Sequence, residues 1–267
     1  MRKTRNPFLY IGGAISAVMV LMIVVGYFWT PYDPEAFVGK KFMSPSWQHL
    51  LGTDNFGRDI FSRVMDGAGT TLFIAVCVVL IGCVAGIIIG SLCGYYGGLP
   101  DVILTRVCDS ITAFPSFLLA LVIVSITGSG TYNIILALGI LFIPSFARIV
   151  RGEFAKCRDL NYIKSAKLMG VRNFRIMFSH ILPNTVPVLF SSITIGFNNA
   201  VLSEASMSFL GIGIQPPHAS LGSMLSDSQN FLKNAPWYAL GTGAVIILLI
   251  LGFSLLSEGL QSSRKGG

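Results

Sequence analysis

The residue types that most often carry chemistry are sparse in this sequence. Five cysteines and three histidines are spread over 267 residues. No cysteine pair has CxxC spacing, and the histidines complete no metal-ligand cluster. We therefore predict no metal site, and we interpret the cysteines as small packing residues.

Nucleotide hydrolysis and serine catalysis are not supported either. Gly39-Lys40-Lys41 lacks the upstream glycine and the strand context of a phosphate-binding loop. Gly90-Ser91 and Gly128-Ser129 have no histidine in the same apolar stretch to activate a serine, which argues against an intramembrane protease. We expect no catalytic residue and no cofactor on this chain.

The polar segment with the most informative pattern runs from residue 148 to residue 183. Residues 148–175 carry eight Lys and Arg against Glu153 and Asp159. An amphipathic segment of this kind either presses into the groove of a partner protein or rests on lipid head groups, and composition alone does not separate the two.

Within this segment we predict two short helices joined by a turn. The first is capped by Asp159 or Asn161 and ends at Met169, with Gly170 in the C-cap turn. The second runs from Phe174 and stops at Pro183. The first helix combines apolar anchors with outward-facing cations: Leu160, Ile163, Met169, Lys164 and Lys167.

The elements that position this segment must be membrane helices. The chain is 53% hydrophobic and 12% charged, whereas soluble domains have about 25% charged residues. Its mean hydropathy is +0.71. A soluble core cannot hide this much apolar surface, which excludes disorder, a secreted disulfide scaffold and a typical soluble enzyme.

Six apolar stretches are long enough to cross a bilayer core of about 30 Å. The uncharged run from Ser110 to Ala147 holds parts of two of them, separated by a turn at Thr127 to Thr131. Pro115 is expected to kink the first of these two. The predicted spans are 8–29, 72–99, 102–127, 131–147, 184–203 and 236–257.

An even number of spans places both termini on the same side of the membrane. Basic residues flank the first and last spans: Arg2, Lys3, Arg5, Arg264 and Lys265. Because loops rich in Lys and Arg stay in the cytoplasm, we predict that both termini and the 148–175 segment are cytoplasmic. The formal net charge of +7 then indicates membrane orientation and no nucleic-acid binding.

The 148–183 segment resembles the EAA loop of ABC importer permeases. The matching positions are Gly152, Tyr162, Ala166, Gly170 and Leu182-Pro183, and the departures are Lys164, Ser165 and His180. In that family the loop forms the coupling helix that docks on the ATPase subunit. A lysine at the glutamate position affects the ion pair made by that glutamate and leaves the docking itself in place.

Further motifs are similar to those of dipeptide, oligopeptide and nickel permeases, in the subunit usually called the C-type permease. They include residues 49–63, Gly94-Tyr95-Tyr96-Gly97-Gly98, Asp101, Arg106, Asp109, Phe114-Pro115, 204–213 and Pro216-Pro217. Together they cover most of the chain between residues 32 and 259. They are specific for the family and carry little information about the cargo.

The resemblance implies an all-α membrane protein with six transmembrane helices and the type I ABC importer permease fold, in the bacterial cytoplasmic membrane. Residues 1–69 would form an N-terminal tail, the first helix and an outer loop. Residues 70–258 would form a five-helix transmembrane domain with the coupling loop at 151–183, and residues 259–267 a short cytoplasmic tail.

The resemblance also implies partners. They are a second homologous permease, two ATP-binding subunits that carry ATP and Mg, an external substrate-binding protein and the lipid bilayer. The implied ATPase-coupling residues are Leu160, Tyr162, Ile163, Lys164, Ser165, Ala166, Lys167, Met169 and Gly170. The candidate substrate-path residues are Phe114, Pro115 and Glu204.

Two questions stay open at this level. The cargo is a peptide, which is the commoner cargo of the family, or nickel or a metal chelate. The alternative from another class is a proton-coupled secondary carrier, which requires buried titratable groups at mid-membrane and inverted repeats. Neither feature is evident in the sequence.

Three polar features have local interpretations. We predict that Arg58 pairs with Asp59, and that Asp101 pairs with Arg106, as structural ion pairs without substrate contact. Glu204 lies near the end of the fifth span, where it either contacts cargo or hydrogen-bonds the turn from Ser206 to Gly213.

Overall fold

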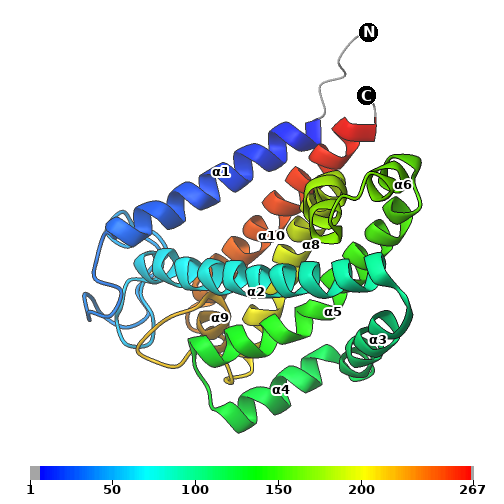
Figure 1. The fold of residues 1–267 in the computed structure, drawn as a ribbon. Helices are drawn as coiled ribbons and strands as arrows, with labels where there is room; N and C mark the ends of the chain where they lie inside the picture. The colour runs from blue at the N-terminus through cyan, green and yellow to red at the C-terminus, as the bar shows by residue number, and fades with distance from the viewer. Residues whose placement is uncertain (1–6, 266–267) are drawn as a thin grey trace. The chain divides into compact units, whose positions relative to one another are not determined.

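The computed structural model describes residues 7–265 and consists mainly of α-helices (Figure 1). Residues 1–6 and 266–267 lie outside the described residues, and with them the predicted N-terminal cations Arg2, Lys3 and Arg5; the side chains of Arg264 and Lys265 are likewise not described. The helices are α1 (Pro7–Phe28), α2 (Ile60–Tyr96), α3 (Gly98–Thr112), α4 (Ser116–Thr127), α5 (Thr131–Arg158), α6 (Asn161–Leu168), α7 (Asn173–Arg175), a π-helix (Ile176–Ile181), α8 (Leu182–Phe209), α9 (Leu221–Gln229) and α10 (Pro236–Lys265).

Within the described residues, five helical runs are long and apolar enough to cross a membrane: α1, α2, α5, α10 and the run from α7 through α8. α3 and α4 pass the same test only as a pair, and they are bent by 85° at the break between them. Counted as one span, the pair completes the six predicted spans. The break contains Pro115, which has no amide hydrogen and disfavours the helical conformation of Phe114, so the predicted kink is confirmed.

The segment from residue 148 to residue 183 is more helical than predicted. α5 continues to Arg158, and the helical run that starts at Asn173 does not stop at Pro183. The π-helix explains this second difference, because the Leu182 amide donates to the Met177 carbonyl five residues back. This wider turn lets the chain keep a helical course, and Pro183 then occupies the first turn of α8, where a missing amide hydrogen costs little.

The chain forms two compact units. The first holds both ends of the described chain together with residues 124–134. The second comprises Cys77–Ile123 and Ile135–Gly196.

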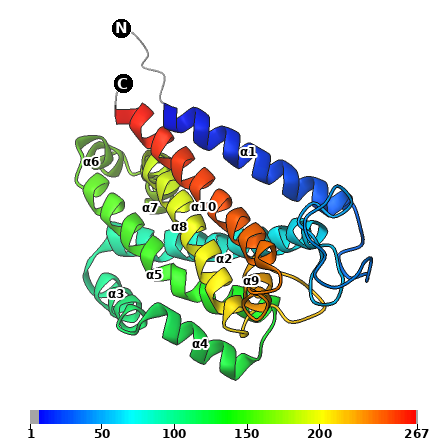
Figure 2. The ribbon, with the colours of Figure 1, turned by 180° about the vertical axis from the view of Figure 1, so that it is seen from behind.

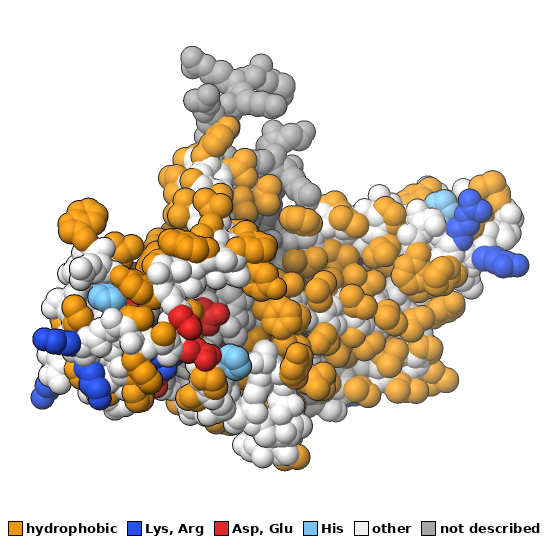
Figure 3. Space-filling view, turned by 90° about the vertical axis from the view of Figure 1, so that its left-hand side faces the viewer, with side chains coloured by type: hydrophobic (Ala, Val, Ile, Leu, Met, Phe, Trp, Pro, Cys, Tyr) orange, Lys and Arg blue, Asp and Glu red, His pale blue; other side chains and the backbone are white. Residues whose placement is uncertain are grey.

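In the first unit, α1 lies along α10 (Figures 1 and 2). Small residues let the two backbones approach, since Gly12 faces the backbone of Leu256 and Gly259 faces that of Leu9. The opposite side of α1 is apolar and exposed, with Val18 at 64% exposure. Hydrophobic side chains also dominate the face drawn in Figure 3, as expected for a protein whose solvent is lipid.

Residues 29–59, all of them described, form no helix and are held in place by buried carboxylates. Asp54 is fully buried and accepts hydrogen bonds from the Phe56 amide at 2.8 Å, the Arg58 amide at 2.9 Å and Arg58 Nε at 2.6 Å. Asp59 caps α2 by accepting from the Ser62 amide at 2.8 Å, and its other oxygen lies 2.9 Å from His49 Nδ1. The predicted pair between Arg58 and Asp59 is therefore wrong, because the tight turn directs Arg58 back to Asp54 and the helix start occupies Asp59.

In the second unit, α2 and α5 touch backbone to backbone. Gly82, Gly86, Gly90 and Gly94 recur every four residues on α2 and therefore share one face. At each position the space for a Cβ is filled by α5: Phe142, Phe146, Ala147, Val150, Arg151 and Phe154. We did not predict this row of contacts from the sequence.

Candidate coupling site and a charged cavity

The short helix α6 forms where the first amphipathic helix was predicted, and its C-terminal turn is as expected. Gly170 has a φ of 76°, the left-handed region that favours glycine. The Val171 amide donates to the Ala166 carbonyl at 3.1 Å, and the Gly170 amide donates to the Lys167 carbonyl at 3.0 Å. This is a Schellman motif, which closes the helix and reverses the chain.

The predicted cap at the start of α6 is wrong. The N-cap residue is Leu160, in an extended conformation, and no side chain caps the helix. Asp159 lies outside the helix, 3.6 Å from Arg158 Nε, and Asn161 is already its first residue. The Asp159 carboxylate, which was expected to cap α6, thus pairs with Arg158 at the C-terminal end of α5.

The side chains of α6 divide into an enclosed face and an exposed face. Ile163 is fully buried and Ala166 nearly so. The other predicted coupling residues are exposed: Leu160, Tyr162, Lys164, Ser165, Lys167, Met169 and Gly170. The Ile163 and Ala166 side chains thus anchor the enclosed face of α6, and most of its remaining surface is exposed.

Polar contacts tie α6 and the following turn to α2 and α8. Lys167 Nζ lies 4.8 Å from the centroid of the Tyr95 ring, a cation–π contact. Tyr95 Oη donates to Asn173 Oδ1 at 2.8 Å, and Asn184 Nδ2 donates to Tyr162 Oη at 3.1 Å. These contacts connect α6 and the following turn to residues at the ends of two long helices.

Three exposed apolar side chains lie around the turn between α6 and α7, and we refer to these three residues as the apolar patch. It consists of Leu168, Met169 and Phe174, which are 90%, 76% and 73% exposed. Leu168 and Phe174 were not among the predicted site residues. The Leu168-Met169 pair at the end of an amphipathic helix is the sequence signal that would have revealed the patch, whereas nothing in the sequence singled out Tyr95 and Asn173 as anchors.

The surroundings of this patch are basic. Lys164, Arg172 and Arg175 are exposed within the same 15 residues. An apolar patch rimmed by cations suits a protein groove with an acidic edge.

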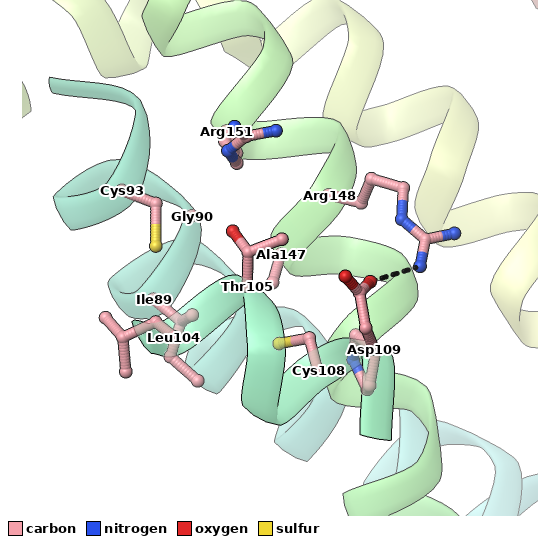
Figure 4. Close-up of a pocket in the computed structure, with 11 residues that line it drawn as sticks. Ile89, Gly90, Cys93, Leu104, Thr105, Cys108, Asp109, Ala147, Arg148 and Arg151 are labelled. Atoms are coloured by element: carbon pink, nitrogen blue, oxygen red, sulfur yellow. Dashed lines mark ion pairs between the residues drawn. The ribbon is translucent and has the colours of Figure 1, made fainter. Parts of the chain in front are cut away.

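The same unit contains a cavity of about 240 Å³ bounded by α2, α3 and α5 (Figure 4). Two ion pairs between α3 and α5 involve its lining residues. Arg151 Nε and Nη2 lie 2.5 and 2.8 Å from the two oxygens of Asp101, whereas Arg148 Nη2 lies 3.6 Å from Asp109 Oδ1. The predicted pair between Asp101 and Arg106 is therefore wrong, because Asp101 points across to α5 and Arg106 is exposed.

The three predicted substrate-path residues lie in different surroundings. Phe114 is 61% exposed at the break between α3 and α4, next to the exposed Pro115. Glu204 belongs to the other unit and is fully buried near the end of α8. Ser208 Oγ, in the last turn of α8, donates to Glu204 Oε1 at 2.7 Å and accepts from the Ile214 amide at 3.3 Å, which corresponds to the second of the two alternatives for Glu204.

In the described part of the chain, no group of three or more His, Cys, Asp or Glu side chains is placed to hold a metal ion. The five cysteines are free thiols. Cys93 and Cys108 both line the cavity in Figure 4, where they serve as packing residues of its wall.

A solved structure shares this architecture. The inward-facing MetNI methionine ABC transporter matches with a TM-score of 0.60 and 19% identity, over 75% of this chain and 94% of the matched chain. At this identity the match shows the fold alone. The fold is therefore that of an ABC importer permease, in agreement with the predicted class.

The family follows from sequence comparison. Residues 86–264 match the model of the binding-protein-dependent transport system inner membrane component, and the chain belongs to this family. It is 40% identical to the glutathione transport system permease protein GsiD of Pectobacterium atrosepticum, over 98% of this chain and 89% of the relative. It is 37% identical to the dipeptide transport system permease protein DppC of Alkalihalophilus pseudofirmus, over 97% and 86% respectively.

A second dipeptide permease, DppC of Haemophilus influenzae, is 36% identical over 97% of this chain and 90% of its own length. The likeness thus extends over nearly the whole chain. This protein is a membrane-embedded permease subunit of an ABC importer, and subunits of this family are not themselves catalytic.

Proposed function

We propose that this chain forms one half of a translocation pore for di- and oligopeptides, delivered by an external binding protein and driven by ATP hydrolysis on partner subunits. The relatives with 36–40% identity over almost the full chain are named as dipeptide and glutathione permeases. Glutathione is itself a tripeptide, so both names indicate short peptides. Nickel or a metal chelate is not favoured by these relatives.

The observation that carries the proposal is the geometry of α6. A short helix anchored through Ile163, Lys167 and Tyr162 presents the apolar patch of Leu168, Met169 and Phe174 outward. In our proposal this patch sits in a groove of an ATP-binding subunit. Movement of that groove, when the nucleotide domains close on ATP and Mg, then rocks α2 and α8 through the Tyr95 and Asn184 contacts.

The proposed assembly contains a second homologous permease and two ATP-binding subunits. One permease provides a single α6, and a pore with two-fold-like symmetry needs two such helices to couple two nucleotide domains. The excess of Lys and Arg between residues 148 and 175 supports a cytoplasmic position for α6 and for both termini. In the same assembly the substrate path passes Phe114 and Pro115, and Glu204 joins it only if its carboxyl leaves Ser208 during transport.

Crosslinking in the assembled importer tests the proposal. In a Cys-free background, Ser165→Cys or Met169→Cys should crosslink to the ATP-binding subunit, and Thr105→Cys, in the wall of the cavity, should do so much less. Uptake of a labelled dipeptide into proteoliposomes should require the ATP-binding subunits and ATP. Crosslinks that form elsewhere and never at α6, or uptake that persists without the ATP-binding subunits, would contradict it.

The same background tests the orientation. Lys41→Cys and Lys233→Cys should react with a membrane-impermeant thiol reagent from outside intact cells, whereas Arg172→Cys should react only after the membrane is opened. Labelling of Arg172→Cys from outside would overturn both the orientation and the coupling role of α6.

A further inference from the structure

The cavity between α2, α3 and α5 contains a charged pair that the coupling role does not use. Its wall combines apolar side chains such as Ile89 and Leu104 with the carboxylate of Asp109 and the guanidinium of Arg148 (Figure 4). In Figure 4 the Asp109 and Arg148 side chains extend toward each other from α3 and α5. A cavity that offers one negative and one positive group beside an apolar wall suits a small molecule with both charges.

The two ion pairs between α3 and α5 are held very differently. Arg151 and Asp101 form a bidentate pair at 2.5 and 2.8 Å, and Thr105 Oγ1 also donates to Asp101 at 3.1 Å. Arg148 and Asp109 touch through one contact at 3.6 Å, and their side chains are 62% and 52% exposed. The first pair fastens α3 to α5, whereas the second is loose and open enough to exchange partners.

We propose that Asp109 and Arg148 receive the charged ends of a peptide in transit, Asp109 its ammonium group and Arg148 its carboxylate. This inference rests on the proposed function, since it names the contact that such a cargo makes inside the pore. Both groups are specificity-determining residues for a zwitterionic cargo. Arg151 is not assigned this role because the bidentate contact with Asp101 holds its guanidinium in place.

The exchange is electrostatically balanced. Before the cargo arrives the two side chains neutralise each other, and with cargo bound each faces one opposite charge, so no charge is left without a partner. The long, exposed Arg148 side chain can swing to match the spacing between the ends of different short peptides. A cavity of about 240 Å³ has the size of a short peptide and excludes a folded domain.

The position of the pair along the chain agrees with this role. Asp109 lies just over one helical turn before Phe114 and Pro115, the exposed break between α3 and α4. The helix axis bends by 85° at that break. Cargo that meets Asp109 therefore meets it close to the point where the α3–α4 span is interrupted.

The test uses the complete importer in proteoliposomes with its binding protein. Asp109→Asn and Arg148→Gln remove one charge each and keep a side chain that can form hydrogen bonds, although glutamine is shorter than arginine. The matched control is Glu153→Gln, which removes the exposed pair with Lys156 on the same helix. The measured quantities are the KM for uptake of a labelled dipeptide, ATPase activity stimulated by the binding protein without cargo, and the yield of complex.

A second readout places the cargo in the cavity. Thr105→Cys, in a Cys-free background, is challenged with a cysteine-containing dipeptide activated as a mixed disulfide with thiopyridine. The Thr105→Cys thiolate attacks the peptide sulfur, a protein–peptide disulfide forms, and thiopyridine leaves with the electron pair of the broken S–S bond. The bound peptide is then identified by mass spectrometry.

We expect Asp109→Asn and Arg148→Gln each to raise the KM about tenfold and to lower the crosslink yield by a similar factor. Cargo-free ATPase activity and complex yield should stay unchanged, and Glu153→Gln should behave as wild type. The inference is overturned if the two variants match the control, or if cargo-free ATPase activity and complex yield fall together with uptake, since a purely structural pair does that. If the wild-type importer takes up no peptide at all, the proposed function fails, and the inference fails with it.

Discussion

Two of the connections between the spans, residues 29–59 and residues 159–172, keep their shapes by different means. The first forms no helix and is fixed by two buried carboxylates, Asp54 and Asp59, while its other acidic and lysine side chains are exposed. The second is largely helical, encloses only Ile163 and Ala166, and leaves Leu168 and Met169 exposed. Both connections leave apolar side chains exposed, Trp47 in the first and Leu168 in the second, but only the first also fixes its backbone through buried carboxylates.

Residues 29–59 keep their backbone path through their own hydrogen bonds, whereas we expect residues 159–172 to be stabilised by contact with a partner subunit. Buried carboxylates with several donors fix a single backbone path and cost much to disturb. A short helix whose exposed end is apolar adds little to the stability of the free subunit and is stabilised when it docks on a partner. Substitutions in the first connection should therefore act on folding, and substitutions at the tip of the second should act on coupling.

The largest effect is expected for Asp54→Ala. This change removes the acceptor for two backbone amides and for Arg58, and it leaves Arg58 and Arg63 without their carboxylate, so the free energy of unfolding should fall by about 3–5 kcal/mol. Thermal unfolding of the purified importer in detergent measures this loss. The exposed Asp33, which accepts only the Glu35 amide at 2.9 Å, provides the control, since Asp33→Ala should cost well under half as much. Equal losses at both positions would contradict the comparison.

A matched pair of truncations on α6 should separate folding from docking. Ile163→Ala empties a fully buried site and should destabilise the protein by about 2–4 kcal/mol. Leu168→Ala removes a side chain that is 90% exposed, so it should leave thermal unfolding of the isolated permease unchanged and weaken its binding to the ATP-binding subunit about tenfold or more. Binding is measured by titrating the ATP-binding subunit onto the permease in nanodiscs. If Leu168→Ala binds as wild type does, the apolar tip is not the docking surface.

A small effect on stability, with a large effect on transport, is expected for Gly170→Asp. An aspartate at a φ of 76° costs about 1 kcal/mol, and no neighbouring atom obstructs its Cβ. The new carboxylate lies beside Met169, where it should prevent docking, so the complex should insert into the membrane but lose ATP-driven uptake. Gly152→Ala, at a helical glycine that also has open space around it, should keep full uptake. Full uptake by Gly170→Asp would show that the turn does not take part in coupling.

The sequence was sufficient to predict the parts of the fold that depend on local patterns. Uninterrupted apolar stretches placed the spans, the prolines and glycines placed the bend at Pro115 and the turn at Gly170, and the spacing of Ala166, Gly170 and Leu182 identified the family. These features need no knowledge of which residues meet across the structure.

Contacts between distant residues could not be predicted in this way. Adjacent opposite charges suggested that Arg58 pairs with Asp59 and Asp101 with Arg106, but Asp54 and Arg151 are the true partners because the turn and the α3–α5 packing bring them closer. Likewise, Pro183 is a stop signal in an α-helix, and only the π-helix before it explains why the chain continues. The contact between Lys167 of α6 and Tyr95 could not be predicted for the same reason, since 72 positions separate the two residues in the sequence.

Four of the six glycines of α2, at positions 82, 86, 90 and 94, have a mechanical consequence for any transport cycle. Because each one faces the α5 backbone or the base of a side chain, a slide of one helix along the other by a single residue would drive larger side chains of α2 into that surface. The contact between α2 and α5 therefore permits one register, and the two helices must move together as one rigid body. We therefore expect any change of shape in this unit to occur away from these four contacts, for example at the helix break between α3 and α4.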